Sequence, residues 1–181
     1  MSYNKWDKDL NDSVKAFEGI RKTILPKIIS GEILTIESAE NDVLIKLDQK
    51  SGIDYIREDK TGMQGIAARA QWGKAWNTFT IRKERHTGAK TELEKRKEQI
   101  EKGYFYPAFT MQAYFDNRTN NSLLSIAIIK TKSLFEFIEN NPEKILQRKS
   151  DNLFIAIEWI HINNLIKTSE LQNNKPKQLR L

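Results

Sequence analysis

Three short runs with the alternation typical of β-strands lie close together between residues 53 and 84, and this cluster constrains the fold more than any other feature. The runs are IDYIRED, MQGIAARAQWG and NTFTIRKE; the turn KTG separates the first two, and Gly73 precedes the third. Helical patterns lie before and after the cluster. Alternating elements around one long strand cluster predict an α/β fold with a mixed central sheet flanked by helices.

Apolar spacing and capping residues predict the helices. One apolar stripe steps by three or four residues, through Leu10, Val14, Phe17, Ile20, Ile24 and Ile28. Pro26 should bend or end that helix. Thr91 and Glu94 form a capping-box pattern and Gly103 suits a C-cap, so a helix is expected over 91–102. Ser133 and Glu136 predict a second capping box, for a helix that stops before Pro142.

The remaining segments are predicted as strands, with one exception. GEILTIES alternates as a strand does, FTMQAYF and LLSIAIIK read as a hairpin, and NLFIAIEWIHI reads as a buried strand in which His161 is a buried core residue. Residues 43–50 favour a short helix. We expect a single domain over 1–171 and a flexible basic tail over 172–181.

Composition limits the chemistry. The chain of 181 residues has no cysteine and two histidines, His86 and His161, which excludes disulfides and histidine-rich zinc sites. A bound metal would need carboxylates and carbonyls, which favours Mg²⁺ or Mn²⁺. The sequence lacks a long apolar run, and its polar start MSYNKWDKDLND does not resemble a signal peptide. We therefore expect a cytoplasmic protein that does not enter a membrane.

The net charge of +6 is concentrated in one part of the chain. Residues 69–102 hold ten Lys or Arg and five Glu, a local excess of +5. Clustered positive charge attracts phosphate backbones, so we predict a nucleic-acid-binding surface made by Lys74, Arg82, Lys83, Arg85 and Lys90. The alternative is a solvated charged helix.

A polar strand face and one aspartate could meet in this region. On a strand through residues 66–71, Ala67, Arg69 and Gln71 point one way, and Ile66, Ala68 and Ala70 point the other. Asp54 lies at the start of the preceding strand. If the two strands pair as a hairpin, Asp54 and the face with Arg69 and Gln71 converge.

Here the sequence resembles the PD-(D/E)xK nuclease superfamily, which includes restriction endonucleases and Holliday-junction resolvases. The matching segments are GID at 52–54 and GIAAR at 65–69, preceded by a helix and a strand and followed by a strand and a helix. The resemblance covers roughly residues 9–102. It implies a restriction-endonuclease-like core with an extra C-terminal hairpin, helix and strand, and Mg²⁺-dependent cleavage of DNA.

The sequence departs from the family pattern at two positions. The signature acid falls on Ala67, which cannot bind a metal, and the signature lysine falls on Arg69. Arginine cannot serve as a base, but it can grip a phosphate or stabilise developing charge. The resemblance assigns Asp54 and Arg69 to the catalytic site and Asp54 to the metal. We add Gln71 to the catalytic site because it shares the polar strand face with Arg69. Glu37 is our choice for the second metal ligand, and the other candidate acids are Glu18, Asp48 and Glu58.

Aromatic residues are interleaved with the cations. Trp72, Trp76 and Phe79 could stack on bases, but tryptophans more often anchor a core.

Three functions are compatible with these patterns: a metal-dependent endonuclease or resolvase, a nuclease-fold protein that only binds nucleic acid, and a phage or mobile-element interaction module that inhibits a host protein. Ala67, in place of the signature acid, favours the protein that only binds nucleic acid over a conventional endonuclease. The basic stretch favours both of these over the interaction module. We therefore predict a DNA-binding protein with a nuclease-like core, acting by analogy as a homodimer.

Overall fold

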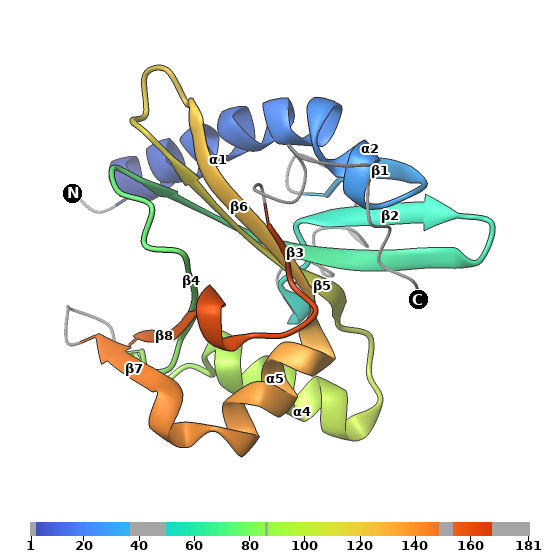
Figure 1. Ribbon diagram of the computed structural model, residues 1–181, viewed down its shortest axis with the longest axis vertical. Coiled ribbons are helices and arrows are strands. Elements are labelled where there is room, and N and C mark those ends of the chain that lie inside the picture. The colour runs from blue at the N-terminus through green and yellow to red at the C-terminus, as the bar shows by residue number, and fades with distance from the viewer. Residues whose placement is uncertain (1–2, 37–49, 86, 149–153, 168–181) are drawn as a thin grey trace.

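The computed structural model describes residues 3–36, 50–85, 87–148 and 154–167 (Figure 1). Its helices are α1 (Tyr3–Thr23), α2 (Leu25–Ile28), α4 (Glu92–Lys102) and α5 (Thr131–Asn140). Its strands are β1 (Glu32–Thr35), β2 (Tyr55–Asp59), β3 (Gly62–Trp72), β4 (Thr78–Arg82), β5 (Pro107–Phe115), β6 (Leu123–Lys130), β7 (Ile145–Arg148), β8 (Phe154–Glu158) and β9 (Ile166–Lys167).

The central sheet has six strands in the order β1-β2-β3-β5-β6-β9. Every neighbouring pair is antiparallel except β3 and β5, which run parallel. Parallel neighbours need a long crossover, and the segment between β3 and β5 supplies one that contains β4 and α4. The predicted α/β fold with a mixed sheet is confirmed, and so is the hairpin β5–β6.

Side chains on β5 and β6 alternate between two separate cores, as a pleated strand requires. On β6, Ile126 and Ile128 enter the core that contains α1 and α2, whereas Ala127 and Ile129 enter the other. The second core lies under α5 and the small antiparallel sheet β4-β8-β7. The central sheet is therefore covered on both faces, by α1 and α2 on one and by α4, α5 and the small sheet on the other (Figure 1).

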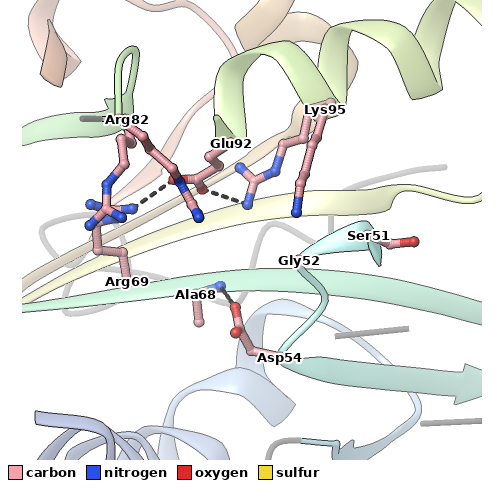
Figure 2. A pocket seen from close by; sticks show the side chains of 10 residues that line it. Ser51, Gly52, Asp54, Ala68, Arg69, Arg82, Glu92 and Lys95 are labelled. Carbon is pink, nitrogen blue, oxygen red and sulfur yellow. Dashed lines mark hydrogen bonds and ion pairs between the residues drawn. The ribbon is translucent and has the colours of Figure 1, made fainter. Parts of the chain in front are cut away.

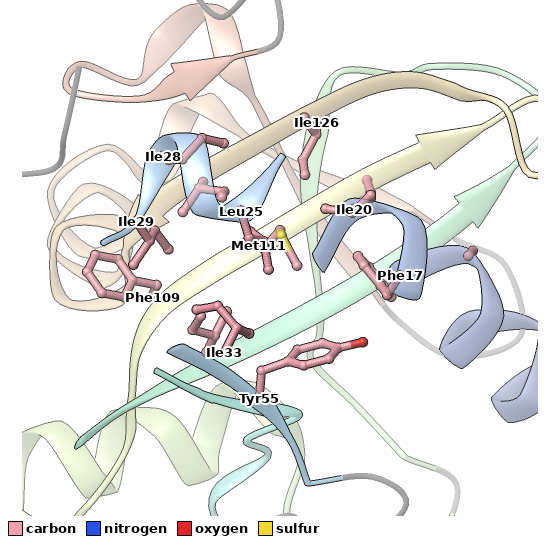
Figure 3. Packing of buried hydrophobic residues seen from close by; sticks show 14 of the residues in the cluster. Phe17, Ile20, Leu25, Ile28, Ile29, Ile33, Tyr55, Phe109, Met111 and Ile126 are labelled. Atoms are coloured by element: carbon pink, nitrogen blue, oxygen red, sulfur yellow. The ribbon is translucent and has the colours of Figure 1, made fainter. Parts of the chain in front are cut away.

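The first core fixes α1 against the sheet (Figure 3). Phe17 and Ile20, from the predicted apolar stripe, are each 3% exposed. The ring of Phe17 meets Tyr55 and Phe115 edge to face, at centroid distances of 6.0 and 6.1 Å. Pro26 lies at the start of the short helix α2, so the bend expected there is present.

Two local predictions are wrong. Helix α5 begins at Thr131, not after Ser133, and its N-cap Lys130 makes no side-chain capping bond. The last buried strand ends at Glu158, and Trp159–His161 form a 3₁₀ turn. His161 is therefore an exposed residue 3.3 Å from Glu158 rather than a core histidine. Residues 43–49 and 172–181 lie outside the described residues, so the short helix and the tail stay predictions.

None of the helices within the described part of the chain is long and apolar enough to cross a membrane.

Candidate functional site

The central sheet has an opening along one edge of β3. Strand β2 pairs with β3 only as far as Tyr55 opposite Ile66, whereas β3 continues to Trp72. At the point where the ladder ends, the backbone N–H of Ala68 donates to Oδ2 of Asp54 at 2.5 Å. The carboxylate of Asp54 therefore holds the chain where the two strands separate.

A groove occupies this opening. Its first part, which we call the basic compartment, has a volume of about 280 Å³ and lies between β3 and helix α4 (Figure 2). Its charged lining consists of Arg69, Arg82, Arg85, Lys95 and Arg96 against Asp54 and Glu92. Five cations against two carboxylates leave a net charge of +3. This compartment favours an anionic ligand.

Helix α4 supplies three of these side chains from one face. The predicted capping box is confirmed: the Thr91 hydroxyl accepts from the backbone N–H of Glu94, whose carboxylate accepts from the backbone N–H of Thr91. Gly103 ends the helix in the left-handed conformation, at φ +66°. Glu92, Lys95 and Arg96 are three and four residues apart, so they project toward the same side of the helix.

Glu92 joins two arginines from different elements. Its Oε2 lies 2.6 Å from Nη2 of Arg69 on β3, and its Oε1 lies 2.7 Å from Nη2 of Arg96 on α4. Burial acts to raise the pKa of Glu92, but the charges of Arg96 and Arg69 outweigh it and the pKa lies below its ordinary value. Glu92 is thus ionised at neutral pH, and it fixes the positions of both guanidinium groups.

The arginines crowd one another. The guanidinium groups of Arg69 and Arg82 each lie 5.2 Å from the ring centroid of Phe154. Burial, followed by the charges of Arg69 and Arg85, lowers the pKa of Arg82 from its usual value. Like charges held this close are stabilised by an anion placed between them.

The structure brings together some of the predicted site residues and not others. Asp54, Arg69, Arg82 and Arg85 line the basic compartment, as expected for a shared site. Gln71 does not: its side-chain amide points toward Thr80 of β4, with Nε2 3.5 Å from the hydroxyl. Gln71 therefore lies at the contact between the two sheets and lines neither part of the groove, and its catalytic role stays a prediction.

Three of the predicted nucleic-acid-binding lysines lie outside the groove. Lys74 stands over the ring of Trp76 at 4.6 Å, and Lys90 pairs with Glu98 of α4. Lys83 lines neither part of the groove. In their place the structure adds Lys95 and Arg96, which the sequence analysis missed. The signal was their position on the predicted helix, on the same face as Glu92.

The aromatic residues divide as follows. Phe79 is 1% exposed and belongs to the second core. Trp72 stacks on Phe115 at 6.0 Å and donates to Asn121, so it anchors the sheet. Trp76 is 50% exposed, and it lines neither part of the groove.

The carboxylates of the described residues do not fit a magnesium centre. Both oxygens of Glu92 already contact arginines, and Oδ2 of Asp54 accepts from Ala68. The described ranges contain no group of three or more His, Asp or Glu side chains suited to a metal. Glu18 and Glu58 line neither part of the groove. Glu37 and Asp48 lie outside the described residues, so their role stays a prediction.

Comparison of this chain with protein-family models, curated proteins and solved structures gives no match, so its function is argued from the groove itself.

Proposed function

We propose that this protein binds nucleic acid, with the phosphate backbone lying in the basic compartment. The observation that carries the proposal is the convergence of five cations from β3, β4, the segment after β4 and α4 on one groove with a net charge of +3. Arginine suits this role because its planar group donates several hydrogen bonds to phosphate oxygens. Clustered cations also release counterions when phosphates bind, which drives association.

The resemblance to PD-(D/E)xK nucleases supports nucleic acid as the ligand. Asp54 and Arg69, which fall on the family's motif segments, line the same compartment. The order of a helix, a strand, the two motif strands, a further strand and a helix is also present, as α1, β1, β2, β3, β4 and α4. We propose on this basis that the core is restriction-endonuclease-like.

The described residues favour binding over hydrolysis. Ala67 is 2% exposed and has no ligand atom, and Arg69 is charged and paired with Glu92. Neither residue can activate a water molecule. We therefore propose a nuclease-like core that binds nucleic acid without cutting it.

A salt titration tests this proposal. Arg82→Ala/Arg85→Ala removes two charges from the groove, and Lys74→Ala/Lys90→Ala removes two charges outside it. Binding of labelled single- and double-stranded DNA is followed by fluorescence anisotropy at increasing salt. The groove variant should bind more weakly, and its slope of log affinity against log salt should be shallower by up to about 2. The control variant should keep the wild-type slope.

Equal effects of the two variants would mean that net charge alone attracts DNA, and the groove would be excluded. An absence of binding to any nucleic acid would refute the proposal and favour the protein-interaction module.

A metal-dependent endonuclease is the second candidate, favoured by one contact. The backbone N–H of Ile36 donates to the backbone carbonyl of Asp54 at 3.0 Å, and Ile36 is the last described residue before the predicted ligand Glu37. Cleavage of linear, branched or single-stranded DNA in Mg²⁺ or Mn²⁺, lost in Asp54→Asn, would support this candidate. No cleavage by the wild type would support binding alone.

A further inference from the structure

The groove does not end at the basic compartment. It continues into a second compartment of about 320 Å³, and Asp54, Ala68, Arg69 and Arg82 line both. The second compartment lies toward α1, which contributes Ser13 and Phe17. Because the two compartments share residues on β3, the groove crosses the open edge of this strand from the face covered by α4 to the face covered by α1.

The two compartments differ in chemistry. Beyond the shared residues, the second compartment is lined by Ser13, Phe17, Tyr55 and Ala70, all of them uncharged. Phe17 and Tyr55 are 3% and 2% exposed and are packed against each other, so they are fixed. Small side chains at Ser13 and Ala70 leave the space open. A volume of this size, with Phe17 and Tyr55 on one side and the shared Asp54, Arg69 and Arg82 on the other, has room for a ring-containing group whose polar edge faces the charged side.

Two arginines that line the basic compartment have a buried side-chain donor without a hydrogen-bond partner within the described residues. The Arg96 side chain is 5% exposed, and its Nε has no hydrogen-bond partner within the described residues. The Nε of Arg82 also has none in that part of the chain. An unsatisfied buried N–H is costly, so the contacts within the described residues leave donor capacity of Arg82 and Arg96 unused.

We propose that the groove holds one unpaired nucleotide, with its phosphate in the basic compartment and its sugar and base in the second compartment. This inference rests on the proposed nucleic-acid binding. A phosphate backbone alone would leave the second compartment empty. A base in an intact duplex is stacked and paired, and it cannot enter a hollow beside the phosphate site without being flipped out. The preferred ligand is therefore single-stranded nucleic acid.

Two substitutions from opposite walls fill the second compartment without touching the basic one. Ala70→Leu acts from β3 and Ser13→Leu acts from α1, and neither residue lines the basic compartment. Ala70→Ser is the matched control, because it changes the same position with little added volume. Probes for the full-length protein are a single-stranded oligonucleotide, the same strand carrying abasic residues, the corresponding duplex, and inorganic tripolyphosphate.

The wild type should bind the base-bearing single strand more tightly than the duplex or the abasic strand. Each leucine variant should weaken binding of the base-bearing strand by about tenfold. Tripolyphosphate affinity should not change, which also shows that the variants are folded. Ala70→Ser should behave as the wild type does.

The outcomes separate the two proposals. If neither oligonucleotides nor tripolyphosphate bind the wild type, nucleic-acid binding itself fails. If they bind but both leucine variants keep full affinity for the single strand, the nucleotide site is overturned while nucleic-acid binding stands. Equal affinity for base-bearing and abasic strands would overturn it in the same way.

Discussion

Replacing Glu92 by glutamine should destabilise the fold more than removing the surface charge of Glu98 from the same helix. The substitution keeps the size of the side chain and removes the negative charge between Arg69 and Arg96. The Arg96 side chain is 5% exposed and the Glu92 side chain 22%, so water cannot replace the lost partner fully. The amide of glutamine would also direct N–H donors at one of the two guanidinium groups.

The magnitude follows from the two ion pairs. At about 4 Å between charge centres and an effective dielectric constant of about 20, each pair contributes an attraction of about 4 kcal/mol. Removing the carboxylate also removes its desolvation cost, which is several kcal/mol, so the net loss is about 3 kcal/mol. For a chain of this length that loss lowers the Tm by roughly 6–12 °C.

Thermal unfolding followed by circular dichroism measures this effect. Glu98→Gln is the matched control, because Glu98 lies on the same helix and also contacts two cations, Lys90 and Lys102, but at the surface. Solvent screens those pairs, so the control should change the Tm little. If Glu92→Gln and Glu98→Gln shifted the Tm equally, the reasoning that Glu92 is a buried link between β3 and α4 would be refuted.

Two further predictions follow from the same structure. Burial acts to raise the pKa of Glu92, but the charges of Arg96 and Arg69 outweigh it, so the pKa in the folded state lies below the ordinary value. The ionised carboxylate therefore stabilises the fold above a pH of about 4.3, and this stabilisation is lost as the pH falls through the lower pKa of the folded state. The difference in unfolding free energy between wild type and Glu92→Gln should therefore narrow from pH 7 to strongly acidic pH, and a constant difference in denaturant titrations would contradict this. Gly65→Ala should cost about 1–3 kcal/mol, because an added Cβ would lie 2.7 Å from Cδ1 of the fully buried Ile53. Gly19→Ala on α1 meets nothing within 4 Å and should instead stabilise by up to about 1 kcal/mol, and the reverse order of the two glycine variants would refute the packing argument.

The elements could be predicted where local chemistry decides them. Thr91, Glu94 and Gly103 set the bounds of α4 because capping bonds are made within a few residues of the chain. Alternation on β3 gave the correct facing: Ala68 and Ala70 pack against the core under α1, whereas Arg69 points toward α4. The strand at 152–162 was predicted too long because the apolar run continues through a 3₁₀ turn that periodicity does not mark.

The site was harder to predict because its members come from separate elements. Asp54 and Arg69 were placed together by the hairpin between β2 and β3, which is a local contact. The contribution of α4 depends on the crossover that brings Glu92 and Arg96 over β3, a tertiary contact across 23 residues or more. Charge counting found the right stretch of chain, but it could not separate Lys90, which pairs with Glu98 and lines neither part of the groove, from Lys95 in the groove.

The charge arrangement of the groove also favours an anionic ligand over a divalent cation. A divalent cation would have to compete with Arg69 and Arg96 for Glu92 and would meet a net charge of +3, whereas a phosphate is attracted by the same charge. Arg69, which falls on the lysine position of the nuclease motif that this segment resembles, can contact both Glu92 and an anionic ligand. Its contact with Glu92 is made through Nη2, and a guanidinium carries five N–H donors in a fixed plane, so one arginine can be held by a carboxylate and still face a phosphate. A lysine here would present a flexible point charge instead, and we infer that the arginine belongs to a site built for positioning an anion.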